Sequence, residues 1–357
     1  MALLNLDALP FSQHRFPVSA MTATATAVAA AALWYFLRRP KVMDETSDLL
    51  KTFVLHESVD RERSVRLGPL SAVQVFPRAR TSAAKGKEGA ETPGLSVVFV
   101  HGMWHGAWYF RDLQKKLADE GIGSYAVTLN SGLTVGLDQH VKDVAGALAS
   151  LPQGKRLVLV GHSQGGLILQ DLLHTVPSTS LPPICGAVLL GTGALGQKDL
   201  VDLTASSVRS SVVSSAGWLP YLRMVLTMSP PPGDVVALQA MFAHFETSEV
   251  SVTGKVISIQ NYLRLLRARP ADGWPTYVSN VYKWGRKEVP NRLGSIERLL
   301  VVQFEDDRCY PEPHTNWLLT HYIGAELLRV PKQAHCAIDS GWEETLGKPL
   351  IHWIKRC

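Results

Sequence analysis

The sequence predicts an α/β protein with a mostly parallel sheet, helices on both faces of the sheet, and a mainly helical cap inserted over one end. Three observations support this prediction. Apolar runs alternate with segments of helical periodicity through residues 95–193, as in parallel strands joined by crossover helices. The alternation stops at residue 194 and resumes at residue 296. Two apolar runs end abruptly in His101-Gly102 and Gly161-His162, as strands do beside a reaction site.

Strands are expected where short runs of β-branched and aliphatic residues are bounded by glycine, proline or charged residues. These runs lie at 63–67, 72–76, 95–100, 125–129, 156–160, 184–190, 299–304 and 326–330. The first two are separated by Gly68-Pro69-Leu70, which predicts an antiparallel hairpin.

Helices are expected where apolar residues recur every three or four positions and so line one face. Val141, Val144 and Leu148 show this spacing. The predicted helices cover 108–120, 139–151, 165–175, 200–211, 219–228, 234–245, 255–268, 313–322 and 342–355. Four of them fall within the insertion, so the cap is expected to be mainly helical.

The predicted organisation has three parts. Residues 1–45 form an N-terminal membrane anchor or targeting segment, residues 46–193 and 296–357 form the core, and residues 194–295 form the cap or lid. Apolar residues of the cap are expected to cover the end of the sheet. They are Trp218, Leu219, Leu222, Met224, Met228, Met241 and Phe242.

The N-terminal segment differs in composition from the rest of the chain. Val18–Leu37 is uncharged and long enough for a membrane-spanning helix, and Arg38, Arg39 and Lys41 follow it. The positive-inside rule then places the body of the protein on the cytoplasmic side. The many Ser, Thr and Ala residues with Asp7 as the one acid before residue 44 also fit a plastid or other organellar transit peptide, and a secretory signal is a third alternative.

Composition excludes several classes of protein. The chain has 357 residues, a formal net charge of +5 and scattered lysines and arginines, so we expect no nucleic-acid partner. Its four cysteines form no CxxC pair and no Cys/His cluster with zinc spacing. We therefore expect no metal and no organic cofactor, while a bridge between Cys309 and Cys336 stays open, as does the oligomeric state.

The segment Gly161-His162-Ser163-Gln164-Gly165 fits the G-x-S-x-G pattern of a nucleophilic serine. A predicted strand precedes it and a predicted helix follows it. Glycines on both sides allow the strand and the helix to approach at a sharp turn, which lifts the serine hydroxyl above the sheet. We therefore predict Ser163 as a nucleophile, with His162 supporting the site or its pocket rather than acting as base.

An oxyanion that forms during attack on a carbonyl needs preorganised hydrogen-bond donors. The backbone N–H of Gln164 is one candidate, because it opens the helix after the serine. The backbone N–H of Met103 is the other, because it follows His101-Gly102 at the end of a strand. Trp104 and Trp108 are candidates for lining the substrate pocket or for packing under the cap.

A serine needs a base within hydrogen-bond reach and a carboxylate to orient that base. His335 is the expected base, because it follows the last predicted strand within KQAHCAIDSGWEE. The orienting acid is expected after the preceding strand, where VVQFEDDRCYP offers Glu305, Asp306 and Asp307.

The segments HGMWHGAW, GHSQGG, EDDRCYP and AHCAIDSGWEE occur in the order found in the α/β-hydrolase superfamily, which residues 70–357 resemble. The first segment is similar to the plant methylesterase and hydroxynitrile-lyase branch, although that branch has a shorter cap. The resemblance implies Asp307 as the acid, because relatives carry it four residues before a proline, here Pro311.

These inferences predict a serine hydrolase of the esterase or lipase type. Its substrate is expected to be a small-molecule or lipid ester, or a thioester, cleaved through a Ser163–His335–Asp307 triad and an acyl-enzyme. The alternatives are an acyltransferase or a hydroxynitrile-lyase-like enzyme on the same fold, and a non-catalytic receptor on the same scaffold.

Overall fold

The computed structural model describes residues 62–76, 94–130, 135–227, 249–252, 255–258, 289–291, 293–294, 296–336 and 342–357, together with Tyr262 and Leu266. The predicted N-terminal segment 1–45, with its span Val18–Leu37, lies outside these residues, as do Met228, Met241 and Phe242 of the cap. Within the described ranges, every helix is too short or too polar to cross a membrane.

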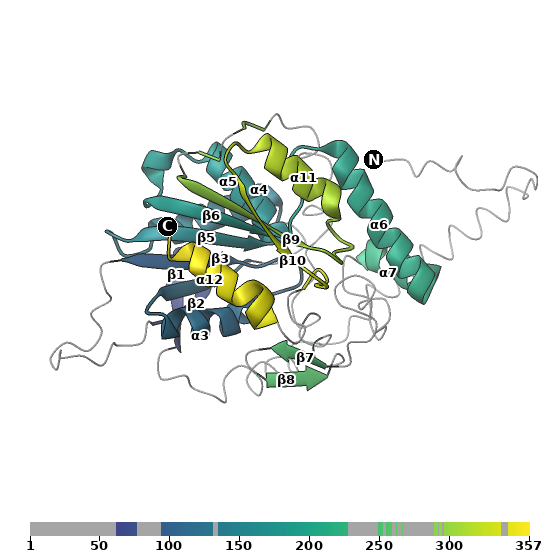
Figure 1. Ribbon diagram of the computed structural model, residues 1–357, viewed down its shortest axis with the longest axis horizontal. Coiled ribbons are helices and arrows are strands. Elements are labelled where there is room, and N and C mark those ends of the chain that lie inside the picture. Colours follow the sequence, from purple (N-terminus) through teal and green to yellow (C-terminus); the bar gives the residue numbers. More distant parts are fainter. Residues whose placement is uncertain are drawn as a thin grey trace, which may run out of the picture. The chain divides into compact units, whose positions relative to one another are not determined.

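The core is an eight-stranded sheet in the order β1-β2-β4-β3-β5-β6-β9-β10 (Figure 1). The strands are β1 Glu62–Leu67, β2 Leu70–Val75, β3 Leu95–Val100, β4 Gly123–Thr128, β5 Arg156–His162, β6 Ile184–Leu190, β9 Arg298–Phe304 and β10 Glu326–Val330. The strands from β4 to β10 are parallel, whereas β2 pairs antiparallel with both β1 and β4. The predicted fold class and the predicted hairpin are therefore confirmed.

Helices cover both faces of this sheet (Figure 1). One layer contains α4 (Leu137–Ala149), α5 (Gln164–Thr175) and α11 (Glu312–His321), and the other contains α3 (Arg111–Asp119) and α12 (Lys348–Ile354). A 3₁₀ turn at Ala107–Phe110 precedes α3, and a π turn at Glu343–Gly347 precedes α12. These turns replace the first residues of two predicted helices.

Alternation along the strands explains the two layers. Val98 and Val100 of β3 pack into the cluster that includes α4 and α5, whereas Val97 and Phe99 pack into the cluster that includes α3 and α12. Successive side chains of a strand point to opposite faces, so a strand buried on both faces is continuously apolar. This is why β3, β5 and β6 appear in the sequence as nearly continuous apolar runs.

The cap contains more strand than the sequence predicts. Helices α6 (Lys198–Ala216) and α7 (Trp218–Thr227) confirm two predicted helices with shifted ends. Strands β7 (Glu249–Val252) and β8 (Lys255–Ser258) form an antiparallel pair, so the helix predicted from residue 255 is wrong over 255–258. The β-branched pairs in EVSV and KVIS, joined by two residues that include Gly254, favour a hairpin over the helical spacing.

The apolar residues predicted to form a lid divide into two groups. Met224 is buried, with 7% of its surface exposed. Trp218, Leu219 and Leu222 are instead exposed, with fractions of 54%, 77% and 47%. They lie in the first half of α7, whose buried contacts come from the half that contains Met224. These three residues therefore do not cover the sheet.

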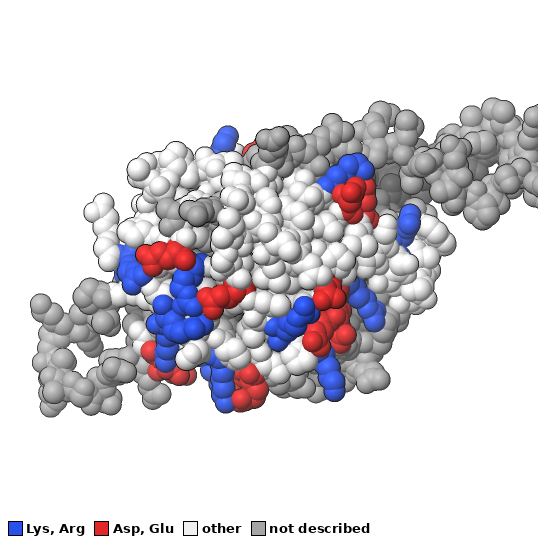
Figure 2. All heavy atoms as spheres, turned by 45° about the horizontal axis from the view of Figure 1, so that its top comes forward, with Lys and Arg blue, Asp and Glu red and all other residues white. Residues whose placement is uncertain are grey.

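Charges of both signs are mixed on the surface. Figure 2 shows basic and acidic side chains next to one another on the face that it presents. Among the described ion pairs, Arg298 lies 2.5 Å from Glu326 and Lys348 lies 2.6 Å from Glu344. Neighbouring charges of opposite sign cancel at a distance, so these pairs create no long-range basic field.

Candidate active site

Ser163 lies on a sharp turn between β5 and α5, and its backbone is strained. Its φ is 55° and its ψ is −122°, a conformation that non-glycine residues rarely adopt. The flanking glycines are required for close packing. A Cβ at Gly165 would lie 2.1 Å from the carbonyl oxygen of Val100, and one at Gly161 would lie 2.6 Å from the backbone of Gly165. The sequence pattern therefore reflects a steric requirement.

The strained turn is held by a side chain from the neighbouring strand. The hydroxyl of Thr192, which follows β6, donates to the carbonyl oxygen of Ser163 over 2.6 Å. The N–H groups of Gly166 and Leu167 donate to the same oxygen. Together these bonds fix the orientation of the peptide group that follows Ser163, and they compensate for its strain.

The side chains of His335 and Ser163 meet above the sheet. His335 follows β10, and its Nε2 lies 3.0 Å from Ser163 Oγ. Both residues are buried, with exposed fractions of 2% and 8%. The other ring nitrogen, Nδ1, lies 2.8 Å from Oδ2 of Asp307, which follows β9. Residues distant in the sequence thus form one continuous hydrogen-bonded chain.

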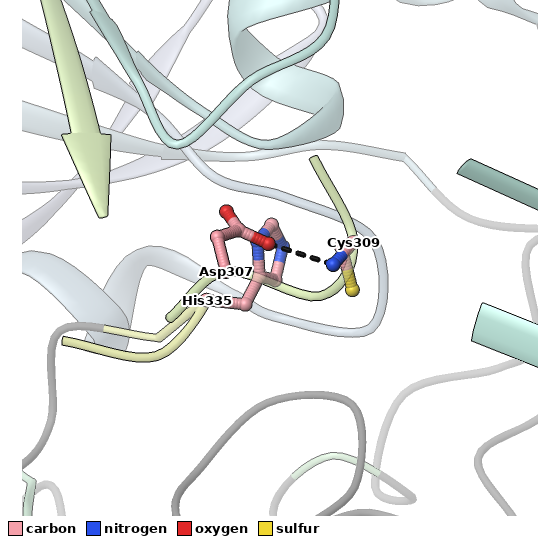
Figure 3. A group of neighbouring side chains, drawn as sticks. All are labelled: Asp307, Cys309 and His335. Carbon is pink, nitrogen blue, oxygen red and sulfur yellow. Dashed lines mark hydrogen bonds and ion pairs between the residues drawn. The ribbon is translucent and has the colours of Figure 1, made fainter. Parts of the chain in front are cut away.

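Both oxygens of Asp307 have partners. The backbone N–H groups of Cys309 and Tyr310 donate to Oδ1 over 2.7 and 2.8 Å, and Figure 3 shows the bond from Cys309 beside the His335 ring. Glu305 and Asp306, the other two candidate acids, are exposed. The structure therefore brings only Asp307 of these three carboxylates to His335.

The hydrogen bonds assign the tautomer of His335. A carboxylate accepts but does not donate, so the proton of the neutral ring lies on Nδ1, facing Asp307. Nε2 then carries a lone pair and accepts the hydroxyl proton of Ser163. This is the state that a general base requires before it removes a proton from a nucleophile.

Asp307, Cys309 and His335 also have the residue types of a metal site. One ligand atom from each lies within 4.8 Å of the others. The thiol must ionise to bind a metal well, but burial and the nearby carboxylate raise the pKa of Cys309 well above its usual value. The Asp307 oxygens are already hydrogen-bonded. These donors fit a charge-orienting carboxylate better than a metal centre.

The backbone N–H of Gln164 is one of the two predicted oxyanion donors. It opens helix α5, where the first N–H groups have no partner within the helix and the helix dipole favours negative charge. It therefore points out of the helix end beside Ser163. A carbonyl oxygen bound at Ser163 would meet a donor of the kind that stabilises an oxyanion.

The backbone N–H of Met103, the second predicted donor, belongs to an anchored peptide group. The Gly102 carbonyl oxygen accepts from His101 Nδ1 over 2.7 Å and from the His105 N–H over 3.3 Å. A trans peptide directs its N–H opposite to its carbonyl, so these bonds set the direction of the Met103 N–H. A Cβ at Gly102 would lie 2.7 Å from Ser163 Cβ, which places this peptide against the serine.

His162 is buried behind His335 and bonds to its backbone. It has no exposed surface, its ring stacks on Tyr109 at 4.6 Å, and its Nε2 donates to the backbone carbonyl of His335 over 3.0 Å. Burial, with the charges of His335 and His105, lowers the pKa of His162 well below its usual value. His162 therefore stays neutral and holds the loop that carries the base.

Trp104 and Trp108 lie where the loop after β3 meets the cap. Trp104 is buried and packs in one cluster with Val212 and Met224 of the cap. The Trp108 ring lies 6.0 Å from the ring of Tyr262, nearly perpendicular to it. Contact with the cap is thus observed for both indoles, and contact with a substrate stays a prediction. Cys309 and Cys336 belong to the same cluster and form no disulfide with each other.

Residues 97–346 match the sequence profile of the alpha/beta hydrolase family. The chain belongs to this family. The matched range begins within β3 and ends within the π turn that precedes α12. It also contains the serine, histidine and aspartate that the fold brings together.

Relatives with assigned names match shorter parts of the chain. A pFDCC methylesterase of Arabidopsis thaliana is 36% identical over 127 residues, which are 33% of this chain and 48% of the relative. A carbendazim hydrolyzing esterase of a Nocardioides species is 35% identical over 91 residues, 23% of this chain and 36% of the relative. The chain thus matches about half of the first relative's length and less of the second's.

A solved structure supports the fold over a longer range. The thermophilic esterase from Thermogutta terrifontis superimposes with a TM-score of 0.54 and covers 82% of this chain and 98% of its own. The sequences are 14% identical, so the likeness concerns the fold. It supports the arrangement of the sheet and its covering helices.

Sequence reasoning missed three residues that support the site. Thr192 lies two residues after β6, and its position beyond the carboxyl end of a parallel strand is a signal that could have drawn attention to it. His105 and Tyr262 bond to each other across 157 positions of sequence. No local pattern predicts such a pair, because only the placement of the cap brings the two side chains together.

Proposed function

We propose that this protein is a serine esterase in which Ser163, His335 and Asp307 form the catalytic triad. The single observation that supports this proposal is the hydrogen-bonded chain from Ser163 Oγ through the His335 ring to Asp307, at 3.0 and 2.8 Å. This series of hydrogen bonds lies at the carboxyl ends of parallel strands, beside the N-terminus of α5.

In the first half of the proposed reaction, Ser163 Oγ attacks the ester carbonyl carbon while its proton moves to His335 Nε2. The carbonyl π electrons move to oxygen, and the backbone N–H groups of Met103 and Gln164 hold the resulting oxyanion. His335 then gives its proton to the leaving alcohol oxygen as the carbon–oxygen bond breaks. Asp307 stabilises the imidazolium that exists between these two transfers.

In the second half, water enters in place of the alcohol. His335 removes a proton from this water, the hydroxide oxygen attacks the acyl carbon, and the same two N–H groups hold the second oxyanion. Collapse returns the proton to Ser163 Oγ and releases the carboxylic acid. Each step uses only residues of this chain and water, so the scheme needs no cofactor.

The proposed substrate is a small-molecule carboxylic ester. The names of the relatives, a methylesterase and an esterase, support this class. A long-chain lipid ester or thioester has less support, because Trp218, Leu219 and Leu222, which were expected to cover an acyl chain, are exposed. A series of nitrophenyl esters tests this: higher kcat/KM for acetate or butyrate than for octanoate is expected, and the reverse order would favour a lipid ester.

Active-site labelling tests the triad. A fluorophosphonate reports a nucleophilic serine, so the wild-type chain should be labelled and Ser163→Ala should not. A panel of methyl esters with an added alcohol then separates hydrolysis from acyl transfer by the products. Cleavage of a cyanohydrin without ester hydrolysis would indicate a lyase. Full biological activity of Ser163→Ala would indicate a receptor.

We further propose that residues 1–45 locate the enzyme in the cell and take no part in its chemistry. The uncharged run Val18–Leu37 and the basic residues after it support a membrane anchor, and the composition also supports transit to a plastid or another organelle. An anchor would keep the full chain in the membrane pellet after alkaline extraction. A transit peptide would leave a soluble, shortened protein. A soluble chain with its original N-terminus would contradict both.

A further inference from the structure

His105 lies outside the proposed triad, yet it joins the oxyanion loop to the cap. Its side chain is buried, with 1% exposed. Nδ1 lies 2.8 Å from the carbonyl oxygen of Met103, and Nε2 lies 2.8 Å from the hydroxyl of Tyr262. Tyr262 belongs to the cap and is also 1% exposed. One imidazole thus connects a cap residue to the segment that carries a proposed oxyanion donor.

The partners of His105 determine where its proton lies. A carbonyl oxygen only accepts, so Nδ1 carries the hydrogen and donates it to Met103. In the neutral ring, Nε2 then accepts a hydrogen bond, which the hydroxyl of Tyr262 donates. The thiol of Cys336, adjacent to His335 in the sequence, lies 3.5 Å from the same nitrogen. A phenol hydroxyl can donate or accept, so the Met103 carbonyl selects the tautomer, and the Tyr262 hydroxyl holds the other side of the ring as a donor.

His105 also stabilises a strained backbone. Trp104 has a φ of 64°, a left-handed conformation that is costly for a bulky residue. The His105 side chain bonds to Met103 on one side of Trp104, and the His105 N–H bonds to Gly102. Both bonds close over the strained residue. The second one orients the peptide whose N–H is the proposed oxyanion donor.

We propose that His105 is a positioning residue for the oxyanion loop, the segment 101–105 after β3, and that Tyr262 of the cap holds its imidazole in place. The cap then takes part in building the oxyanion pocket as well as covering it. This inference rests on the proposed esterase function, because it assigns a role to a donor used in that reaction.

Removing the Tyr262 hydroxyl tests this contact with a small change. In Tyr262→Phe the aromatic ring remains, but Nε2 of His105 loses the phenol and keeps the weaker Cys336 thiol among its described partners. The imidazole is then held less firmly against the Met103 carbonyl. We expect kcat to fall about tenfold, less than the ~100-fold loss on deleting an oxyanion donor, while KM stays within twofold.

The variants at His105 form a cycle with Tyr262→Phe. His105→Asn retains an N–H near the position of Nδ1 and should keep more activity than His105→Ala. Adding Tyr262→Phe to His105→Ala should cost nothing further, because the connection is already absent. Tyr322→Phe is the matched control. It deletes another buried hydroxyl, which bonds to Gln170 and His174 away from the loop.

A transition-state analogue separates positioning from general stability. A trifluoromethyl ketone forms an oxyanion on the serine, so Tyr262→Phe should weaken its inhibition about tenfold, and Tyr322→Phe should leave it unchanged. The inference is overturned if Tyr262→Phe matches the control in kcat and in inhibition, or if its losses follow melting temperature alone. A wild-type chain that hydrolyses no ester would instead refute the proposed function, and the inference with it.

Discussion

Protonation of His314 should destabilise the fold in acid. This residue lies on α11 with 1% of its surface exposed. Its Nδ1 accepts the backbone N–H of Ala194, so the neutral ring carries its proton on Nε2, which lies 2.8 Å from the hydroxyl of Thr204 in α6. Burial is the main cause that lowers the pKa of His314 from 6.5 to about 4. The ring is therefore neutral when it joins the core to the cap.

The pKa shift sets the size and the pH window of the effect. Because the folded pKa is lower than the unfolded pKa, the unfolded chain binds the proton more tightly. The stabilisation is complete above about pH 6.5 and is lost as the pH falls toward 4. Linkage from these two pKa values gives a loss of about 2 kcal/mol between pH 7 and pH 5, and about 3 kcal/mol by pH 4.

Urea unfolding at pH 7 and pH 5 measures this loss in the wild type and in His314→Asn. The asparagine oxygen takes the place of Nδ1 as an acceptor and does not titrate. The free energy of unfolding should fall by about 2 kcal/mol more in the wild type than in the variant over this interval. Other titrating groups, such as His162, contribute equally to both chains. Equal pH dependence in the two chains would refute the assignment.

Three further predictions follow from the nucleophile turn and its acid. Asp307→Asn should lower kcat about 10³- to 10⁴-fold with little change in melting temperature, because an amide no longer favours the required tautomer of His335; a kcat within tenfold of wild type would contradict the triad. Gly165→Ala should cost about 3 kcal/mol or more of stability, because its Cβ would lie 2.1 Å from a backbone oxygen. The control Gly154→Ala, at φ +84° with open space around it, should cost about 1 kcal/mol. Equal losses in urea unfolding would rule out the steric explanation. Ser163→Gly should be more stable than Ser163→Ala by about 1 kcal/mol, because glycine relieves the strain at φ 55°. A higher melting temperature for Ser163→Ala than for Ser163→Gly would show that backbone strain at this position does not lower stability.

Local sequence was enough to locate the core elements and the turn that bears Ser163. Apolar runs specify buried parallel strands because such strands have apolar neighbours on both faces. Gly161 and Gly165 are visible in the sequence because the turn leaves no space for a side chain at either position. The hairpin β7–β8 was missed, since Val256 in its second strand also fits the helical spacing predicted over 255–268.

The choice among Glu305, Asp306 and Asp307 shows where local sequence is insufficient. All three follow β9, and the resemblance to relatives implied Asp307 through its spacing to Pro311. The loop conformation then brings the carboxylate of Asp307 to His335. The same holds for His162, whose support of the His335 loop depends on a contact across 173 positions.

The sequence by itself determined the order of the core strands and helices and indicated the proposed nucleophile and base, because each depends on residues close together along the chain. Tertiary structure decided that Asp307 contacts His335, that His162 bonds to the backbone of His335, and that Tyr262 of the cap meets His105. The physical reason is that hydrogen bonds act over about 3 Å in space. Chain separation sets no limit on which groups meet, so packing of the whole fold must choose them.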